Sequence, residues 1–200
     1  MGNYAQGDYS AYGGAISNEG TITNIIDSEF KGNSATNVGG AISNKGQIDK
    51  VTGNFKNNSA NGLVAYGGAI YHDGHVGNIT GNFINNSATS TEYYAYGGAI
   101  YNYNGGTIGD ITGNFENNSA TSTENEAKGG AIYNDHGTIG NITGNFENNS
   151  ATSTEDYANG GAIYNDISTA LNIIADDRNI KFDGNYVLSN TNNGGAIYNT

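Results

Sequence analysis

The chain has 200 residues, of which 32 are glycine, and it contains no proline, cysteine or tryptophan. Its 19 acidic and 7 basic residues leave a formal net charge of -12, which disfavours nucleic acids and anionic membrane surfaces as partners. The lack of cysteine excludes disulfides and thiolate metal sites. No apolar run approaches the ~20 residues of a membrane-spanning helix, so we expect no membrane insertion by this segment.

Two motifs alternate along the chain and predict a repeat architecture. The tetrapeptide GGAI begins at Gly13, Gly39, Gly67, Gly97, Gly129, Gly160 and Gly194. Every phenylalanine opens a Phe-x-(Gly/Asn)-Asn motif between two of these, at Phe30, Phe55, Phe83, Phe115, Phe146 and Phe182. Such self-similarity, here at 26 to 34 residues, is typical of a solenoid whose units bury their apolar faces on one another. We therefore interpret residues 1–200 as one repeat domain, a segment of a longer protein.

Each repeat predicts one coil of three short strands. In the unit that begins at Gly129, strand-like residues occupy 129–134, 138–143 and 145–151. Corners are expected at 135–137, at 144–145 and after Ala151, because Gly and Asn readily adopt left-handed backbone. About six stacked coils then predict an all-β parallel β-helix. The alternative is disorder, which 15 tyrosines, 6 phenylalanines and regularly spaced isoleucines argue against.

Equivalent side chains should form rows along the stack. The Ile of GGAI and the Phe of the second motif are expected to face inward. The Asn that closes each Phe motif is expected to stack as an amide ladder, at Asn33, Asn58, Asn86, Asn118, Asn149 and Asn185. The tyrosine after GGAI is expected to face outward, as a self-stacked ladder or as exposed rings that bind sugar or protein. Ser17 and Ser43 hold this position in the first two units.

Residues suited to catalysis are sparse. We interpret His72 and His136 as solvated loop residues, and the pair Asp176–Asp177 as a solvated turn. Four other aspartates are dispersed along the chain without a basic partner for acid–base chemistry: Asp73, Asp110, Asp135 and Asp166. We therefore predict no enzyme, no metal site and no cofactor. A Thr row suggests an ice-binding array as an alternative, but no Thr-x-Thr strand accompanies it; the row consists of Thr52, Thr80, Thr112 and Thr143.

The spacing from the Phe motif to the next glycine pair varies along the chain, being 9 residues from Phe30 to Gly39 and 14 from Phe83 to Gly97. Loops on a rigid scaffold are common recognition sites, although tolerated insertions would give the same pattern. The candidate binding residues in these loops are Tyr93, Tyr94, Tyr96, Glu124, Glu126, Glu155, Asp156 and Tyr157. A second candidate set is the outward row Tyr101, Tyr133 and Tyr164.

The pairing of GGAI with FKGN, FKNN, FINN, FENN and FDGN resembles the repeat pair GGA(I/L/V) and FxxN of chlamydial polymorphic membrane proteins and other autotransporter-like proteins. The resemblance runs from Gly13 to Ile197. It implies a right-handed β-helical passenger on the outside of the bacterial cell, an adhesin for a host-cell surface protein or glycan. The first alternative is an extracellular fibre or surface-layer component that assembles end to end through the solenoid ends. A carbohydrate-active enzyme is the third hypothesis.

Overall fold

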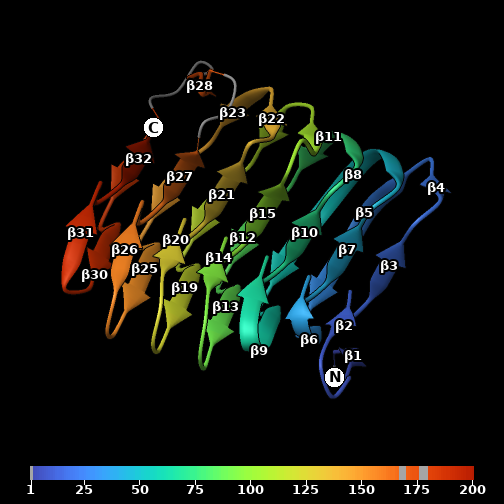
Figure 1. Ribbon diagram of the computed structural model, residues 1–200. Coiled ribbons are helices and arrows are strands. Elements are labelled where there is room, and N and C mark those ends of the chain that lie inside the picture. The colour runs from blue at the N-terminus through green and yellow to red at the C-terminus, as the bar shows by residue number, and fades with distance from the viewer. Residues whose placement is uncertain (1, 167–169, 176–179) are drawn as a thin grey trace.

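The computed structural model describes residues 2–166, 170–175 and 180–200 of the chain. Within these ranges every regular element is a β-strand, and successive repeats wind into about six coils of a right-handed parallel β-helix (Figure 1). Each strand pairs in parallel with its counterpart one repeat away. The predicted fold class is confirmed. The expected turn at Asp176–Asp177 lies outside the described residues.

The strands form three sheets that run the length of the stack. The isoleucine sheet contains β3 (Ile16–Asn18), β7 (Ile42–Asn44), β10 (Ile70–His72), β15 (Ile100–Tyr103), β21 (Ile132–Asp135), β27 (Ile163–Asp166) and β32 (Ile197–Asn199). The phenylalanine sheet contains β4 (Thr21–Ile22), β5 (Ile25–Lys31), β8 (Gln47–Lys56), β11 (His75–Thr80), β12 (Phe83–Ile84), β16 (Thr107–Ile108), β17 (Ile111–Thr112), β18 (Phe115–Glu116), β22 (Thr138–Ile139), β23 (Asn141–Thr143), β24 (Phe146–Glu147), β28 (Asn172–Ile173) and β29 (Phe182–Asp183).

The third sheet, the serine–alanine sheet, closes each coil and leads into the next glycine pair. It contains β1 (Tyr4–Ala5), β2 (Ala11–Tyr12), β6 (Ser34–Val38), β9 (Ser59–Tyr66), β13 (Ser87–Ser90), β14 (Ala95–Tyr96), β19 (Ser119–Ser122), β20 (Ala127–Lys128), β25 (Ser150–Ser153), β26 (Tyr157–Asn159), β30 (Tyr186–Leu188) and β31 (Thr191–Asn193). In Figure 1 its strands reach the lower edge of the molecule, where the chain turns back towards the isoleucine sheet.

The third predicted strand and the third predicted corner were both wrong. Residues 145–151 do not form one strand, because Asn148 adopts a left-handed conformation (φ 55°) and turns the chain from β24 into β25. The stretch after Ala151 is largely strand, formed by β25 and β26 with a short turn at 154–156. The prediction placed Asn148 inside a strand. Asparagine, however, is also the non-glycine residue best suited to left-handed backbone.

The core of the helix is a single apolar column. The six phenylalanines stack face to face, with neighbouring ring centroids 4.7–5.0 Å apart and ring planes within 3° of parallel. These spacings match the distance between adjacent strands of a sheet. The isoleucines of GGAI also pair in register, and those at 42, 70, 100, 132 and 163 are at most 2% exposed. Both inward rows are therefore confirmed.

The glycine pair before Ala-Ile makes a bend that only glycine allows. Gly97 has φ 65°, which is left-handed backbone. A Cβ atom on Gly98 would lie 2.0 Å from the carbonyl oxygen of Gly130 in the next coil. The bend brings the residue before the pair close to the tyrosine after GGAI, so that the rings of Tyr96 and Tyr101 have centroids 5.7 Å apart.

This bend creates a second apolar cluster outside the main core, and it overturns the expectation of an exposed tyrosine row. The exposed fractions of Tyr71, Tyr101, Tyr133 and Tyr164 are only 3–7%. Their rings pack on one another and on Tyr66, Tyr96, Tyr103, Tyr198 and Val38. We call this cluster the tyrosine column. The self-stacked alternative was therefore the right one, because the bend covers rings that the strand alternation alone would leave exposed.

Asparagine ladders bind the coils together. In the predicted ladder, Asn86 Nδ2 donates to Asn118 Oδ1 at 3.0 Å, and Asn118 Nδ2 donates to Asn149 Oδ1 at 2.9 Å. A second ladder follows the tyrosines, where Asn102 Nδ2 donates to Asn134 Oδ1 at 2.7 Å. The predicted amide ladder is confirmed, and the second one was not anticipated.

His72 occupies one step of this second ladder, and the expectation that it is solvated was wrong. It is fully buried and pairs in register with Asn44 and Asn102. Its Nδ1 lies 3.2 Å from Asn44 Nδ2, and its Nε2 lies 3.1 Å from the carbonyl oxygen of Thr107. Burial lowers the pKa of His72 to about 4, although backbone hydrogen bonds to Thr107 and Gly74 oppose this shift.

We expect His72 to make the protein less stable in acid. The folded pKa lies below the ordinary value of 6.5, so the unfolded chain binds the proton more tightly. Stability should therefore fall as the pH drops from about 7 to 4, by about 3 kcal/mol from this residue. His72→Asn should remove this contribution, since asparagine fills the equivalent position in the neighbouring coils. Urea unfolding at both pH values measures it.

The exposed His75 in the same coil provides the matched control. His75→Asn should leave the pH dependence of the unfolding free energy close to that of the unmodified protein. Equal pH dependence in the His72→Asn variant and the unmodified protein would contradict the assignment.

Candidate binding surfaces

Three equivalent four-residue segments at the lower edge of the serine–alanine sheet form a ridge. They lie where β13 leads into β14, β19 into β20 and β25 into β26, and we define the loop ridge as residues 91–94, 123–126 and 154–157, of which Tyr157 is also the first residue of β26. Their first two positions are Thr and Glu in all three coils, whereas the last two differ. The equivalent segments on either side are shorter by two residues: Leu63–Val64 in β9, and Asn190–Thr191 at the start of β31.

Buried serines hold these loops in register. Ser122 Oγ donates to the carbonyl oxygen of Tyr93 at 2.6 Å, and Ser153 Oγ donates to that of Asn125 at 2.5 Å. Ser90 makes the same contact with the shorter coil, through the carbonyl oxygen of Leu63 at 2.6 Å. Each loop is thus bonded to the preceding one, so the ridge is an ordered surface.

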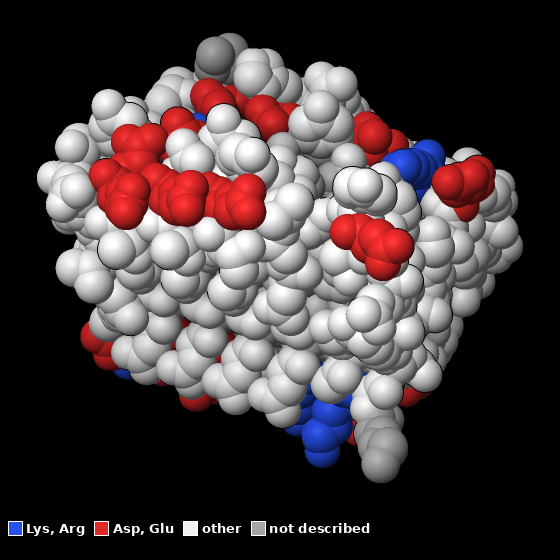
Figure 2. Space-filling view, turned by 60° about the horizontal axis from the view of Figure 1, so that its bottom comes forward, with Lys and Arg blue, Asp and Glu red and all other residues white. Residues whose placement is uncertain are grey.

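The ridge carries acidic and aromatic side chains that reach solvent. Glu124 and Glu155 are exposed and occupy equivalent positions with the half-exposed Glu92. Figure 2, in which this edge is turned forward, shows acidic side chains in a line along it. The exposed fractions of the tyrosines at 93, 94 and 157 are 46%, 38% and 45%. Asp156 is half-buried.

Two of the loop candidates belong to another environment. Tyr96 lies in β14 and is half-buried in the tyrosine column. Its hydroxyl donates to Glu126 Oε2 at 2.9 Å, and Glu126 also pairs with Lys128 Nζ at 2.7 Å. These two candidates therefore hold the base of the ridge to the column, and neither is a freely exposed loop residue.

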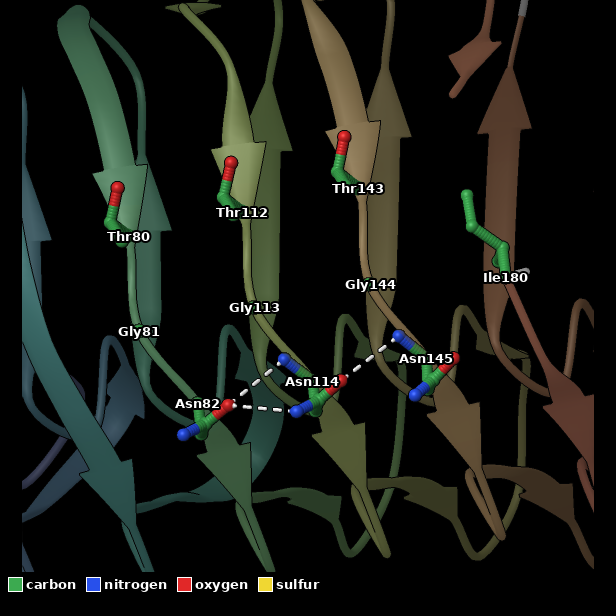
Figure 3. Close-up of a pocket in the computed structure, with 10 residues that line it drawn as sticks. All are labelled: Thr80, Gly81, Asn82, Thr112, Gly113, Asn114, Thr143, Gly144, Asn145 and Ile180. Carbon is green, nitrogen blue, oxygen red and sulfur yellow. Dashed lines mark hydrogen bonds between the residues drawn. The ribbon is translucent and has the colours of Figure 1, made fainter. Parts of the chain in front are cut away.

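A polar groove runs along the opposite bend, where Thr-Gly-Asn precedes each phenylalanine. Figure 3 shows the threonines in one row and the asparagines in another, with glycines between them. A cavity of about 310 Å³ lies here, lined by residues 80–82, 112–114, 143–145 and Ile180. Asn114 Nδ2 donates to Asn82 Oδ1 at 3.2 Å, so the amides bond mainly to each other. The threonine row lies in a concavity, which disfavours the ice-binding alternative because a lattice needs a flat face.

A second pocket interrupts the tyrosine column near its N-terminal end. Its volume is about 260 Å³, and it is lined by Tyr12, Val38, Lys45, Tyr66, Tyr71, Asp73, Tyr101 and Tyr103. We call it the tyrosine pocket. Lys45 Nζ lies 4.3 Å from the centroid of the Tyr12 ring, a cation–π contact. The candidate Tyr101 lines this pocket, whereas Tyr133 and Tyr164 pack within the column.

Within the described part of the chain, one cluster of groups has the chemistry to hold a metal ion. Ligand atoms of Asp135, His136 and Asp166 lie within 4.8 Å of one another. Protein donors already occupy the carboxylates, since Tyr101 donates its hydroxyl to Asp135 Oδ2 at 2.8 Å and Tyr133 donates to Asp166 Oδ2 at 3.2 Å. His136 is exposed, and its hydrogen bond with Asp135 raises its pKa. These acids serve first as partners of buried tyrosine hydroxyls.

The recurring unit agrees with a known family. The model of the Chlamydia polymorphic membrane protein repeat matches residues 27–45, 112–135, 143–166 and 179–200. Four segments of the chain thus match this repeat. Comparison with curated proteins and with solved structures gives no significant match.

Each matched segment of the polymorphic membrane protein repeat contains one Phe motif and the next glycine pair. It therefore passes from the phenylalanine sheet through the serine–alanine sheet into the isoleucine sheet. The coils of Phe55 and Phe83 share this register. Such a solenoid fits a non-enzymatic protein of the bacterial surface. In the described ranges no helix is long and apolar enough to cross a membrane.

Proposed function

We propose that this segment belongs to the passenger of a bacterial cell-surface adhesin, which binds a host-cell protein or glycan through the loop ridge without catalysis. The observation that carries the proposal is the exposure of varied side chains on a rigid, hydrogen-bonded edge. Exposed aromatic rings such as Tyr93 and Tyr157 supply contact area, while the Glu row supplies charge. The carboxylates favour a partner surface that is basic.

The tyrosine column is less suited than the loop ridge to bind a large partner. Rings that are 3–7% exposed offer little surface to a large partner, and their hydroxyls at Tyr101 and Tyr133 are already bonded to carboxylates. The ridge, by contrast, varies in residue type at its third and fourth loop positions, as at Tyr93, Asn125 and Asp156. Loops of varied sequence on a constant scaffold are common recognition sites.

Shortening the ridge tests the proposal. Residues 90–93, 122–125 and 153–156 are each replaced by Ser-Asn, the pair that connects β30 to β31 in this same chain. Because that shorter coil already closes, we expect the fold to persist. Binding to epithelial cells, or to immobilised glycans in surface plasmon resonance, should fall at least tenfold at equal folded concentration.

Tyr133→Phe is the matched control, because it removes one buried hydroxyl and leaves the ridge unchanged. Cell binding by this variant should equal that of the unmodified protein. Equal binding by the ridge-shortened protein would refute the ridge as the recognition surface. Filaments that form with rising concentration, without cell binding, would instead support the structural fibre.

A further inference from the structure

The tyrosine pocket exists because the coil that contains Val38 and Ser43 has no tyrosine at either position of the column. The register places Val38 where the next coil has Tyr66, and Ser43 where it has Tyr71. On the other side of this coil the corresponding residue is Tyr12, with Lys45 Nζ above its ring. The pocket is therefore a space about one coil wide between aromatic walls.

The hydroxyl of Tyr71, which lines the pocket, lacks the aspartate partner that Tyr101 and Tyr133 have. Tyr101 and Tyr133 donate their hydroxyls to the aspartate of the next coil. For Tyr71 that position is Tyr103, which pairs in register with Asp135. Tyr71 is only 7% exposed, yet its hydroxyl makes no hydrogen bond with any residue in the described part of the chain. This hydroxyl belongs to a residue that lines the pocket, and it is not enclosed by protein.

Charged groups complete the lining. Asp73 is half-buried, and burial raises the pKa of its carboxyl, although Lys45 opposes the shift. Lys45 itself is exposed. The pocket thus presents a carboxylate, an ammonium group and phenolic hydroxyls beside aromatic rings. An apolar occupant would displace water from these polar groups without supplying hydrogen-bond partners, which costs free energy.

We propose that the tyrosine pocket binds a single pyranose ring, as a free sugar or as the end of a glycan. The apolar face of a pyranose packs on a tyrosine ring, and its hydroxyls both donate and accept hydrogen bonds, as Asp73, Lys45 and the Tyr71 hydroxyl require. The volume of about 260 Å³ lies below the roughly 300–1,000 Å³ of pockets that hold drug-sized ligands, which suits one ring. The proposal goes beyond the ridge-mediated binding proposed above, because it names a ligand class at a site separate from the ridge.

The test is titration of the 200-residue protein with methyl glycosides of glucose, galactose, mannose, fucose, N-acetylglucosamine and sialic acid. Binding is followed by two-dimensional amide NMR. At least one glycoside should shift amide signals around Val38, Lys45, Tyr71 and Asp73, with a dissociation constant near 1 mM, as suits one small ring. No shift with any of the six sugars would overturn the proposal.

Variants distinguish the pocket from nonspecific contact. Val38→Tyr places in this coil the residue that the next coil already has, and it should weaken sugar binding at least tenfold by filling the space. Tyr71→Phe should weaken it about fivefold, because it removes the unpartnered hydroxyl. The same change at Tyr133, whose hydroxyl is bonded to Asp166, is the matched control and should leave the affinity unchanged.

Sugar binding that survives both Val38→Tyr and Tyr71→Phe would also refute the pocket. Asp73→Asn serves as a third variant, expected to bind the sugar at least fivefold more weakly. The ridge-shortened protein should bind methyl glycosides normally, so a failure of the ridge hypothesis and a failure of the pocket give different results. Loss of sugar binding only in the ridge-shortened protein would assign the sugar to the ridge and overturn the pocket.

Discussion

Replacing Phe115 with alanine is expected to lower the free energy of unfolding by roughly 3–5 kcal/mol. The ring is fully buried and lies between those of Phe83 and Phe146, with centroids 4.8 Å away on both sides. Removing it leaves a cavity that the stacked strands cannot close, because hydrogen bonds to both neighbouring coils hold their spacing. Reversible denaturation in urea, followed by circular dichroism, measures the change.

Tyr93→Ala is the control for this experiment. Tyr93 is also aromatic, but it is 46% exposed on the loop ridge, so its removal should cost less than about 1 kcal/mol. A loss below about 1 kcal/mol for Phe115→Ala would show that the ring does not fill the core as described.

Replacing Asn118 with alanine is expected to destabilise the protein by on the order of 4 kcal/mol. Asn118 Oδ1 accepts from both Asn86 N and Asn86 Nδ2, each at 3.0 Å. Its Nδ2 donates to the carbonyl oxygen of Phe83 and to Asn149 Oδ1, each at 2.9 Å. The residue is fully buried, so its loss leaves the Asn86 backbone N–H and other groups without partners or ready access to water.

Asn114 offers the matched comparison within the same coil. It also takes part in a ladder, since its Nδ2 donates to Asn82 Oδ1 at 3.2 Å, but this contact is exposed. Water can replace a lost partner there, so Asn114→Ala should cost less than about 1 kcal/mol. Similar losses for the two variants would show that burial does not control the strength of these ladders.

The repeat pattern of the sequence was sufficient to predict the parallel β-helix, its register and its two inward rows. The reason is physical: Phe83, Phe115 and Phe146 recur at one position of each unit, and only in-register stacking buries all of them together. The Asn118 ladder followed from the same register, because identical amides at one strand spacing can donate and accept along the stack.

What the sequence could not decide was the course of the chain between those rows. Two-residue alternation predicts that Tyr101 points away from Ile100, but it does not predict that the glycine bend places Tyr96 against it. Nor could spacing show that Asn148 turns the corner between β24 and β25 while Asn149, next to it, joins the buried ladder. The two asparagines differ in backbone conformation, which the folded structure sets.

The pocket and the buried histidine depend on contacts between coils. The sequence shows that Ser43 departs from the tyrosine row. It gives no sign that Val38, the residue before a glycine pair, matters for the same cluster. Only the glycine bend and the inter-coil register place these two positions together, beside Tyr71 and its unpartnered hydroxyl. His72 likewise belongs to an asparagine ladder that no single unit reveals. Local sequence thus determined which residues recur, and tertiary packing determined which of them are covered, paired or left facing a cavity.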